Sequence, residues 1–153
     1  ILFKLKEEEI DFEVAILGEE FKEYPQIFNE AQLRLRDHIV QFGYCETFEE
    51  YASWLWKADI LPVTSNQDFF GISIVEAIYC NAYPILPERL SYPELFNSKS
   101  NSNHFYKNDK ELYQKLKDSL LNTNLKTTLS KLVKQYNWKE ISSIYDKLLN
   151  GFK

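Results

Sequence analysis

The sequence has 153 residues, of which 44% are hydrophobic and 16% aromatic, and its 18 basic and 23 acidic side chains give a net charge of −5. This length suits one domain with one sizeable core, and the composition excludes an intrinsically disordered chain. The sequence has no uninterrupted run of about 18 apolar residues, which excludes a membrane-spanning helix, and its two cysteines are too few for a disulfide framework. We therefore expect a cytoplasmic protein. Because the sequence begins at Ile1 and contains no Met, we also expect it to be part of a longer chain.

Apolar, β-branched segments alternate along the chain with segments of helical periodicity. The first kind predicts strands at residues 12–18, 38–44, 59–64, 82–86 and 104–106. The second kind predicts helices at residues 1–9, 25–36, 48–58, 72–80, 108–120, 122–136 and 138–150, and a helical turn at 91–97. The alternation predicts an α/β fold, a Rossmann-like doubly wound parallel sheet with helices on both faces, in a single domain over residues 1–153.

Local signals mark several ends of these elements. Thr47, with Glu50 three residues later, has the spacing of a capping box at the start of a helix. Pro62 has no N–H group, so one edge of strand 59–64 should be bulged or unpaired. Asn81 is a suitable stop for the helix before it.

Charge is distributed unevenly along the sequence. Residues 1–100 carry 8 basic and 18 acidic side chains, net −10, whereas residues 101–153 carry 10 basic and 5 acidic ones, net +5. A basic carboxyl-terminal part can contact a polyanionic partner. Lysines on the outer faces of solvated helices would give the same pattern, and both interpretations remain open.

Three glycine-containing turns follow predicted strands. In an open parallel sheet, ligands bind at the carboxyl ends of the strands, near the point where the strand order reverses. Gly18, Gly43 and the loop 65–71 each follow a predicted strand. We expect these turns to lie on one edge of the sheet and to border the ligand.

The segment from Thr64 to Glu76, TSNQDFFGISIVE, combines a strand end, a polar loop, a glycine and a helix start. The first N–H groups of a helix have no internal partner and carry partial positive charge, which favours a phosphate. Gly71 lets a ligand approach the backbone closely. Asp68 and Glu76 add two carboxylates, and a carboxylate can accept hydrogen bonds from a pair of sugar hydroxyls. The alternatives are that Asp68 only caps the helix and that Glu76 is an incidental polar residue.

The same segment resembles the Glu-x7-Glu element of the retaining, family-four glycosyltransferases of GT-B architecture. Asp68 takes the place of the first Glu, Phe70-Gly71 that of a Phe-Gly pair, and Glu76 that of the second Glu. Asp in place of Glu is a departure that shortens the side chain by one methylene group. Residues 136–138, Tyr-Asn-Trp, resemble the start of the last helix of these enzymes, which packs back on the amino-terminal domain.

A narrower resemblance is to the carboxyl-terminal half of the tRNA-queuosine mannosyltransferases. It is carried by residues 17–31, 42–44 and 68–96, and within them by Glu76-Ala77-x-Tyr79-Cys80 and Leu90-x-Tyr92-Pro93-Glu94-x-Phe96. This resemblance implies the nucleotide-sugar-binding half of a two-domain enzyme that transfers mannose from GDP-mannose to queuosine in tRNA, with no further cofactor.

The resemblance also assigns roles to the candidate residues. Glu76 would hold the ribose hydroxyls of the nucleotide and Asp68 would face the donor sugar, which makes these two the catalytic candidates. The other residues would contact the donor through backbone and shape: Gly18 beside the diphosphate, Gly43 and Tyr44 beside the base, and Phe70, Gly71 and Ile72 beside the diphosphate and sugar.

Part of the family's catalytic set is not found in this chain. In the family an Arg and a Lys at the start of this domain neutralise the diphosphate, and no such pair precedes Gly18. We therefore expect the chain to be inactive without its own amino-terminal domain. His38 and His104 are far apart and neither cysteine has CxxC spacing, so we expect no metal site. Two other functions remain open: a family-four transferase with another nucleotide-sugar donor and a glycan or lipid acceptor, and a non-catalytic nucleotide-binding or interaction module.

Overall fold

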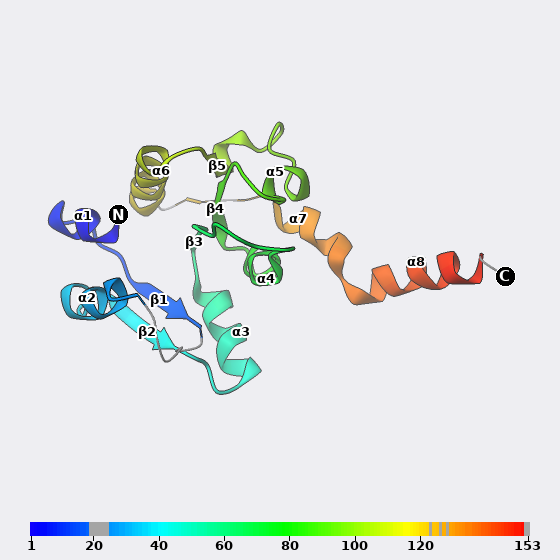
Figure 1. Cartoon of the computed structure of the whole chain (residues 1–153), viewed down its shortest axis with the longest axis horizontal. Coiled ribbons are helices and arrows are strands. Elements are labelled where there is room, and N and C mark those ends of the chain that lie inside the picture. The colour runs from blue at the N-terminus through cyan, green and yellow to red at the C-terminus, as the bar shows by residue number, and fades with distance from the viewer. Residues whose placement is uncertain (19–24, 123, 126, 128, 152–153) are drawn as a thin grey trace.

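Short parallel strands form the centre of the structure (Figure 1). The computed structural model describes residues 1–18, 25–122, 124–125, 127 and 129–151. Within these residues the strands form two hydrogen-bonded groups, one with the order β1-β2 and one with the order β3-β4-β5, and every pair is parallel. Their bounds are Val14–Leu17 for β1, Ile39–Gly43 for β2, Ile60–Pro62 for β3, Tyr83–Pro87 for β4 and Phe105–Tyr106 for β5.

Helices connect and cover the strands, which confirms the predicted α/β class. The α-helices are α1 (Leu2–Glu7), α2 (Ile27–Arg34), α3 (Phe48–Lys57), α4 (Ile72–Tyr79), α5 (Tyr92–Leu95), α6 (Asp109–Leu121), α7 (Leu129–Val133) and α8 (Trp138–Asn150). Two 3₁₀ turns, η1 (Ser102–His104) and η2 (Lys134–Tyr136), precede β5 and α8 respectively.

Pro62 explains why one edge of β3 is unpaired. The N–H group of Val63 donates to the carbonyl of Ile85 in β4 at 2.9 Å, so the backbone nitrogen of the preceding residue faces away from β4. That residue is Pro62, which has no N–H to offer to a strand on the other side. In the described residues β3 pairs only with β4, as the sequence predicted.

Two apolar clusters lie on opposite faces of β4. Ile85 and Leu86 are adjacent and fully buried, and side chains of adjacent strand residues point to opposite faces. Ile85 packs in a cluster with residues of α1 and α6, whereas Leu86 packs in a cluster with residues of α4, α5 and α7. Helices therefore cover both faces of this sheet, which is the doubly wound arrangement.

The predicted helix at residues 122–136 is wrong in its first half. Helix α7 begins only at Leu129, and residues 124, 125 and 127 are not helical, while residues 123, 126 and 128 lie outside the described part. Asn and Thr side chains compete locally for backbone N–H groups. The Asn122 side chain accepts from the N–H of Asn124 at 3.0 Å, and the Thr127 hydroxyl accepts from the N–H of Leu129 at 3.1 Å. A smaller error concerns His104, which lies in η1 rather than in β5.

The last helix forms as predicted but extends away from the rest of the molecule (Figure 1). None of the residues of α8 is buried. Its large apolar side chains are mainly exposed: Trp138, Ile144, Tyr145, Leu148 and Leu149. Across the described residues, no helix combines the length and the apolar character needed to span a bilayer.

Candidate functional site

The predicted loop turns into α4 at Gly71, which lies in the left-handed region with φ of 78°. A Cβ atom at this position would lie 3.2 Å from Ile74 Cδ1 and 3.3 Å from both Asp68 Oδ2 and Tyr92 Cε1. The position therefore requires glycine for its backbone conformation and for the closeness of its neighbours. The Gly71 carbonyl accepts the first hydrogen bonds of the helix, from the N–H groups of Ile74 and Val75 at 3.0 Å.

Asp68 is bound by a buried tyrosine. The Tyr92 hydroxyl donates to Asp68 Oδ2 at 2.7 Å, and the side chain of Tyr92 is fully buried at the start of α5. Burial and this hydrogen bond raise the pKa of Tyr92 to about 12, so its hydroxyl stays a donor at neutral pH. None of the hydrogen bonds found among the described residues joins the Asp68 carboxylate to an amide of α4. Asp68 therefore does not cap α4.

Glu76 is bound by a second tyrosine. The Tyr51 hydroxyl of α3 donates to Glu76 Oε2 at 2.9 Å, and both side chains are half-buried. Burial, and then the bond to Glu76, raise the pKa of Tyr51 above its usual value, so it too stays protonated. A half-buried carboxylate on an apolar helix needs such a partner, and Tyr51 supplies it. Within the described residues, the second oxygen, Oε1, has no hydrogen-bond partner.

A pocket of about 390 Å³ opens next to Tyr51, at the carboxyl ends of β1 and β2. The N–H group of Gly18 donates to the carbonyl of Gly43 at 3.1 Å, which joins the two strand ends. Gly43 adopts a φ of 104°, and this turn directs the chain towards the exposed Tyr44. The lining residues are Leu17, Gly18, Tyr44, Cys45, Glu46, Thr47, Phe48 and Tyr51.

The structure thus divides the predicted site residues into two groups. Gly18 and Tyr44 line the pocket, Gly43 is hydrogen-bonded to Gly18 beside it, and Glu76 reaches its edge through Tyr51. The second group lies along the loop: Asp68, Phe70, Gly71 and Ile72, none of which lines that pocket. Phe70 packs edge-on against Tyr136, with ring centroids 5.1 Å apart, and Ile72 is 66% exposed. For both groups of residues, contact with a donor remains a prediction.

Three residues that contact the candidate site are not among the predicted site residues. Tyr51 and Tyr92 hold the carboxylates, and Arg89 donates from Nε and Nη2 to the carbonyls of Ser65 and Thr64, each at 3.1 Å. Tyr92 stands in the Leu90–Phe96 segment that carries the narrower resemblance, which was a usable signal. Nothing local in the sequence distinguishes Tyr51 from the other aromatic residues of its helix.

The thiols and histidines are not arranged for nucleophilic or metal chemistry. Burial raises the pKa of both Cys45 and Cys80, so both thiols stay protonated at neutral pH. His104 is buried, and its Nδ1 lies 2.9 Å from the carbonyl of Pro84. In the described part of the chain, no three His, Cys, Asp or Glu side chains are grouped so that they could hold a metal ion.

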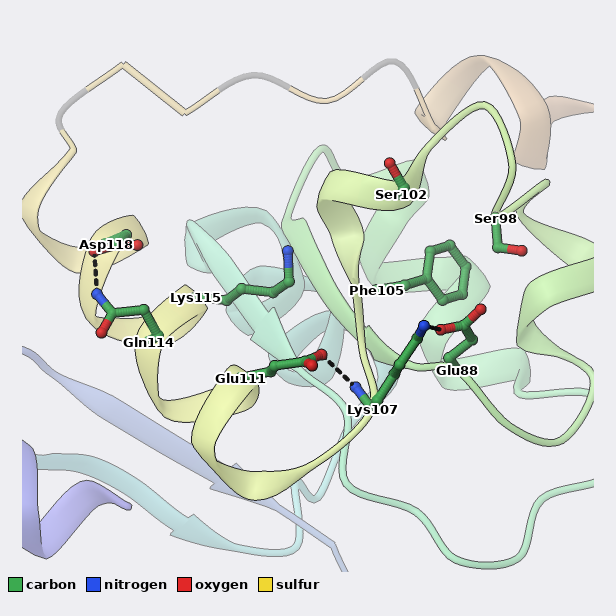
Figure 2. A pocket seen from close by; sticks show the side chains of 9 residues that line it. All are labelled: Glu88, Ser98, Ser102, Phe105, Lys107, Glu111, Gln114, Lys115 and Asp118. Atoms are coloured by element: carbon green, nitrogen blue, oxygen red, sulfur yellow. Dashed lines mark hydrogen bonds and ion pairs between the residues drawn. The ribbon is translucent and has the colours of Figure 1, made fainter.

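A larger cavity of about 560 Å³ lies elsewhere, between the end of β5 and α6 (Figure 2). Its charges are mixed and partly paired, since Lys107 Nζ lies 3.5 Å from Glu88 Oε2 and Lys115 Nζ donates to the carbonyl of Asn103 at 2.8 Å. None of the predicted site residues lines it. Of the two pockets, the smaller one is lined by two of the predicted site residues, Gly18 and Tyr44.

Comparisons of the sequence with known proteins identify its family. The family described as "Glycosyl transferases group 1" matches residues 2–136. A tRNA-queuosine alpha-mannosyltransferase of Drosophila melanogaster is 38% identical over 112 residues, which cover 73% of this chain and 29% of the relative. An uncharacterized glycosyltransferase of Methanocaldococcus jannaschii is 26% identical over 157 residues, covering 92% of this chain and 42% of the relative.

The chain thus spans less than half the length of these curated relatives. No solved structure gives a significant match. The family match covers both groups of site residues, from the first pocket residues to the loop before α4. The chain belongs to the group 1 glycosyl transferases.

Proposed function

We propose that this chain is the donor-binding domain of a retaining glycosyltransferase that transfers mannose from GDP-mannose to queuosine in tRNA. The acceptor and sugar are suggested by the relative that is 38% identical and is named a tRNA-queuosine alpha-mannosyltransferase. The observation that carries the proposal is the position of Glu76. It is bound through Tyr51 to the edge of the pocket at Gly18 and Tyr44, and one of its oxygens has no partner among the described residues.

In this proposal the donor lies along the carboxyl edge of the strands. Glu76 accepts hydrogen bonds from the ribose hydroxyls, while Gly43 and Tyr44 flank the base in the pocket. Gly18 borders the diphosphate, whose negative charge is stabilised by the amino terminus of α4. The sugar lies beside Asp68, next to the backbone of Phe70, Gly71 and Ile72.

The amino-terminal part of the full-length protein supplies the rest of the enzyme in this proposal. Helix α8 offers an apolar face with Trp138 at 73% and Leu149 at 67% exposure, which suits packing on another domain. The net charge of −10 over residues 1–100 disfavours extensive contact between that part and RNA phosphates. Contact with tRNA is therefore assigned to the basic residues after position 100 or to the amino-terminal domain.

Transfer of labelled mannose from GDP-mannose to queuosine-containing tRNA by the full-length protein tests this function. Glu76→Gln keeps the size of the side chain but removes its charge, so we expect kcat/KM to fall about 10- to 100-fold, the usual effect of losing hydrogen bonds to a charged group. Glu49→Gln is the matched control, because Glu49 is an exposed carboxylate in the first turn of α3. Equal rates for all three proteins would contradict the role of Glu76. Transfer from a UDP-sugar, or to a glycan or lipid only, would support the other family-four function.

A further inference from the structure

The loop 64–71, which runs from the end of β3 to the start of α4, is fastened at both ends by the segment that follows β4. At its beginning, Arg89 binds two successive carbonyls, those of Thr64 and Ser65. Near its end, the Tyr92 hydroxyl binds Asp68, and the Tyr92 ring borders Gly71. These attachments follow from the fold, because β3 and β4 are paired in parallel and their carboxyl ends emerge side by side.

The position of the Tyr92 hydroxyl is set by the core. The Tyr92 ring packs in the buried cluster that contains Val63 from the end of β3 and Ile74 from α4. A fully buried ring in a close-packed core has one conformation, so its hydroxyl is a fixed point. Asp68, in contrast, is half-buried, and its neighbour Phe69 is 93% exposed. The hydrogen bond of 2.7 Å thus connects Asp68, in the surface loop 64–71, to a side chain of the domain interior.

The chemistry of the pair fits an orienting role. The hydroxyl of Tyr92 stays protonated because the ring is buried, and a carboxylate is a strong acceptor for such a donor. Binding of Oδ2 leaves the other oxygen, Oδ1, without a hydrogen-bond partner among the described residues. A carboxylate held by one oxygen presents the second one in a fixed direction, which is the requirement for a group that must contact a reacting sugar.

We propose that Tyr92 is a positioning residue for Asp68 and that Arg89 and Tyr92 together hold the loop 64–71 in its working conformation. The assignment of Asp68 to the donor sugar rests on the proposed function, whereas the fastening of the loop does not. Tyr92 acts through Asp68 and contacts neither donor nor acceptor.

The variants Tyr92→Phe and Tyr113→Phe, made in the full-length protein, form a matched pair. The Tyr113 hydroxyl also donates to a carboxylate, that of Glu8, but its ring packs in the cluster on the other face of β4, away from the loop 64–71. With Tyr92→Phe we expect kcat for mannose transfer to fall roughly 100-fold, the effect of a misplaced reacting group, while KM for the donor changes less than about twofold. With Tyr113→Phe we expect kcat to change less than about twofold.

A double-variant cycle separates positioning from a general effect on the fold. In an Asp68→Ala background there is no carboxylate to orient, so adding Tyr92→Phe should change kcat by less than about twofold. Hydrogen exchange provides a readout that needs no substrate. Tyr92→Phe should speed exchange of the amides of residues 65–71 about tenfold, the equivalent of one lost hydrogen bond, and Tyr113→Phe should leave them unchanged.

Each outcome decides one claim. The inference is overturned if Tyr92→Phe matches Tyr113→Phe in kcat or in exchange, or if its effect on kcat persists in the Asp68→Ala background. If the parent protein transfers no sugar from any nucleotide donor, the proposed function falls. Hydrogen exchange alone then decides whether Tyr92 fastens the loop.

Discussion

At the scale of single residues, the two acidic side chains of the candidate site share one structural solution. In each, one carboxylate oxygen accepts a hydrogen bond from a tyrosine hydroxyl: Asp68 from Tyr92, and Glu76 from Tyr51. The burial of these tyrosines raises their pKa, which keeps them neutral and avoids placing two negative charges side by side. A carboxylate that is already partnered in this way can be half-buried without a large desolvation cost, while its second oxygen stays available to a ligand.

Gly71→Ala should distort this arrangement. The new methyl group would meet Asp68 Oδ2 and Tyr92 Cε1 at 3.3 Å, and the residue would have to keep a left-handed conformation. We expect the free energy of unfolding to fall by about 1–2 kcal/mol, which is the usual penalty for that conformation in a residue with a Cβ. Urea unfolding measures this change.

Gly18→Ala is the control for that substitution. A Cβ at Gly18 would have no heavy atom within 4 Å, so its effect on unfolding should stay within about 0.5 kcal/mol. Equal losses for the two alanine variants would show that the loop tolerates a side chain at Gly71 and that the contacts described for it are not restrictive.

At the scale of elements, the sequence predicted helix ends correctly where those ends depend on residues close together in the chain. The cap at Thr47 is confirmed, because its hydroxyl accepts from the N–H of Glu50 at 3.1 Å. The reciprocal bond differs from a standard capping box, since the Glu50 carboxylate accepts from the N–H of Glu46. Asn81 ends α4 with a φ of 72°, as a helix stop of this kind requires.

Hydrogen bonds between segments far apart in the chain could not be predicted from the sequence. The sequence selected Asp68 and Glu76 as candidates, but the tyrosine that binds Asp68 is 24 residues away from it and the one that binds Glu76 is 25 residues away. Such pairs are set by how α3 and α5 pack against the loop and α4, and helical periodicity does not encode that packing. Helix 122–136 was predicted too long for a local reason. Hydrogen bonds of the Asn122 and Thr127 side chains to nearby N–H groups prevail there over the apolar pattern.

The contact between η1 and β4 should make stability depend on pH. His104 is buried beside Tyr83, with ring centroids 4.4 Å apart, and it binds the carbonyl of Pro84. Burial lowers the pKa of His104 below its ordinary value of 6.5, so the folded protein favours the neutral ring. The stabilisation from this residue is fully present above pH 6.5 and is lost as the pH falls below it.

Unfolding of the parent and of His104→Gln between pH 5 and 8 checks this dependence. The difference between their unfolding free energies should be constant above about pH 6.5 and should shrink below it by up to about 1.4 kcal/mol per pH unit. Carboxylates common to both proteins cancel in this difference. Parallel curves over the whole range would contradict the buried, neutral state of His104.

At the scale of the whole molecule, the chain combines an acidic α/β body with a basic, helical carboxyl-terminal part. The candidate site lies on the acidic body, and in the proposed function a phosphate is bound there by backbone amides and the amino terminus of α4 more than by lysines. In the proposed function the working enzyme includes a further domain, and the exposed apolar face of α8 and the length of the relatives both support that part of the proposal. Measurements of function therefore belong to the full-length protein.

The central claim is that Glu76 and the loop before α4 bind a nucleotide sugar, and thermal unfolding of the full-length protein with GDP-mannose tests it most directly. At a ligand concentration 100 times the dissociation constant, binding stabilises the folded state by about 2.7 kcal/mol, which raises the unfolding midpoint by several degrees. The account predicts this rise for the parent and for Glu49→Gln, and its loss in Glu76→Gln. An unchanged midpoint for the parent with GDP-mannose, GDP, UDP-glucose and UDP, or an equal rise in Glu76→Gln, would contradict it.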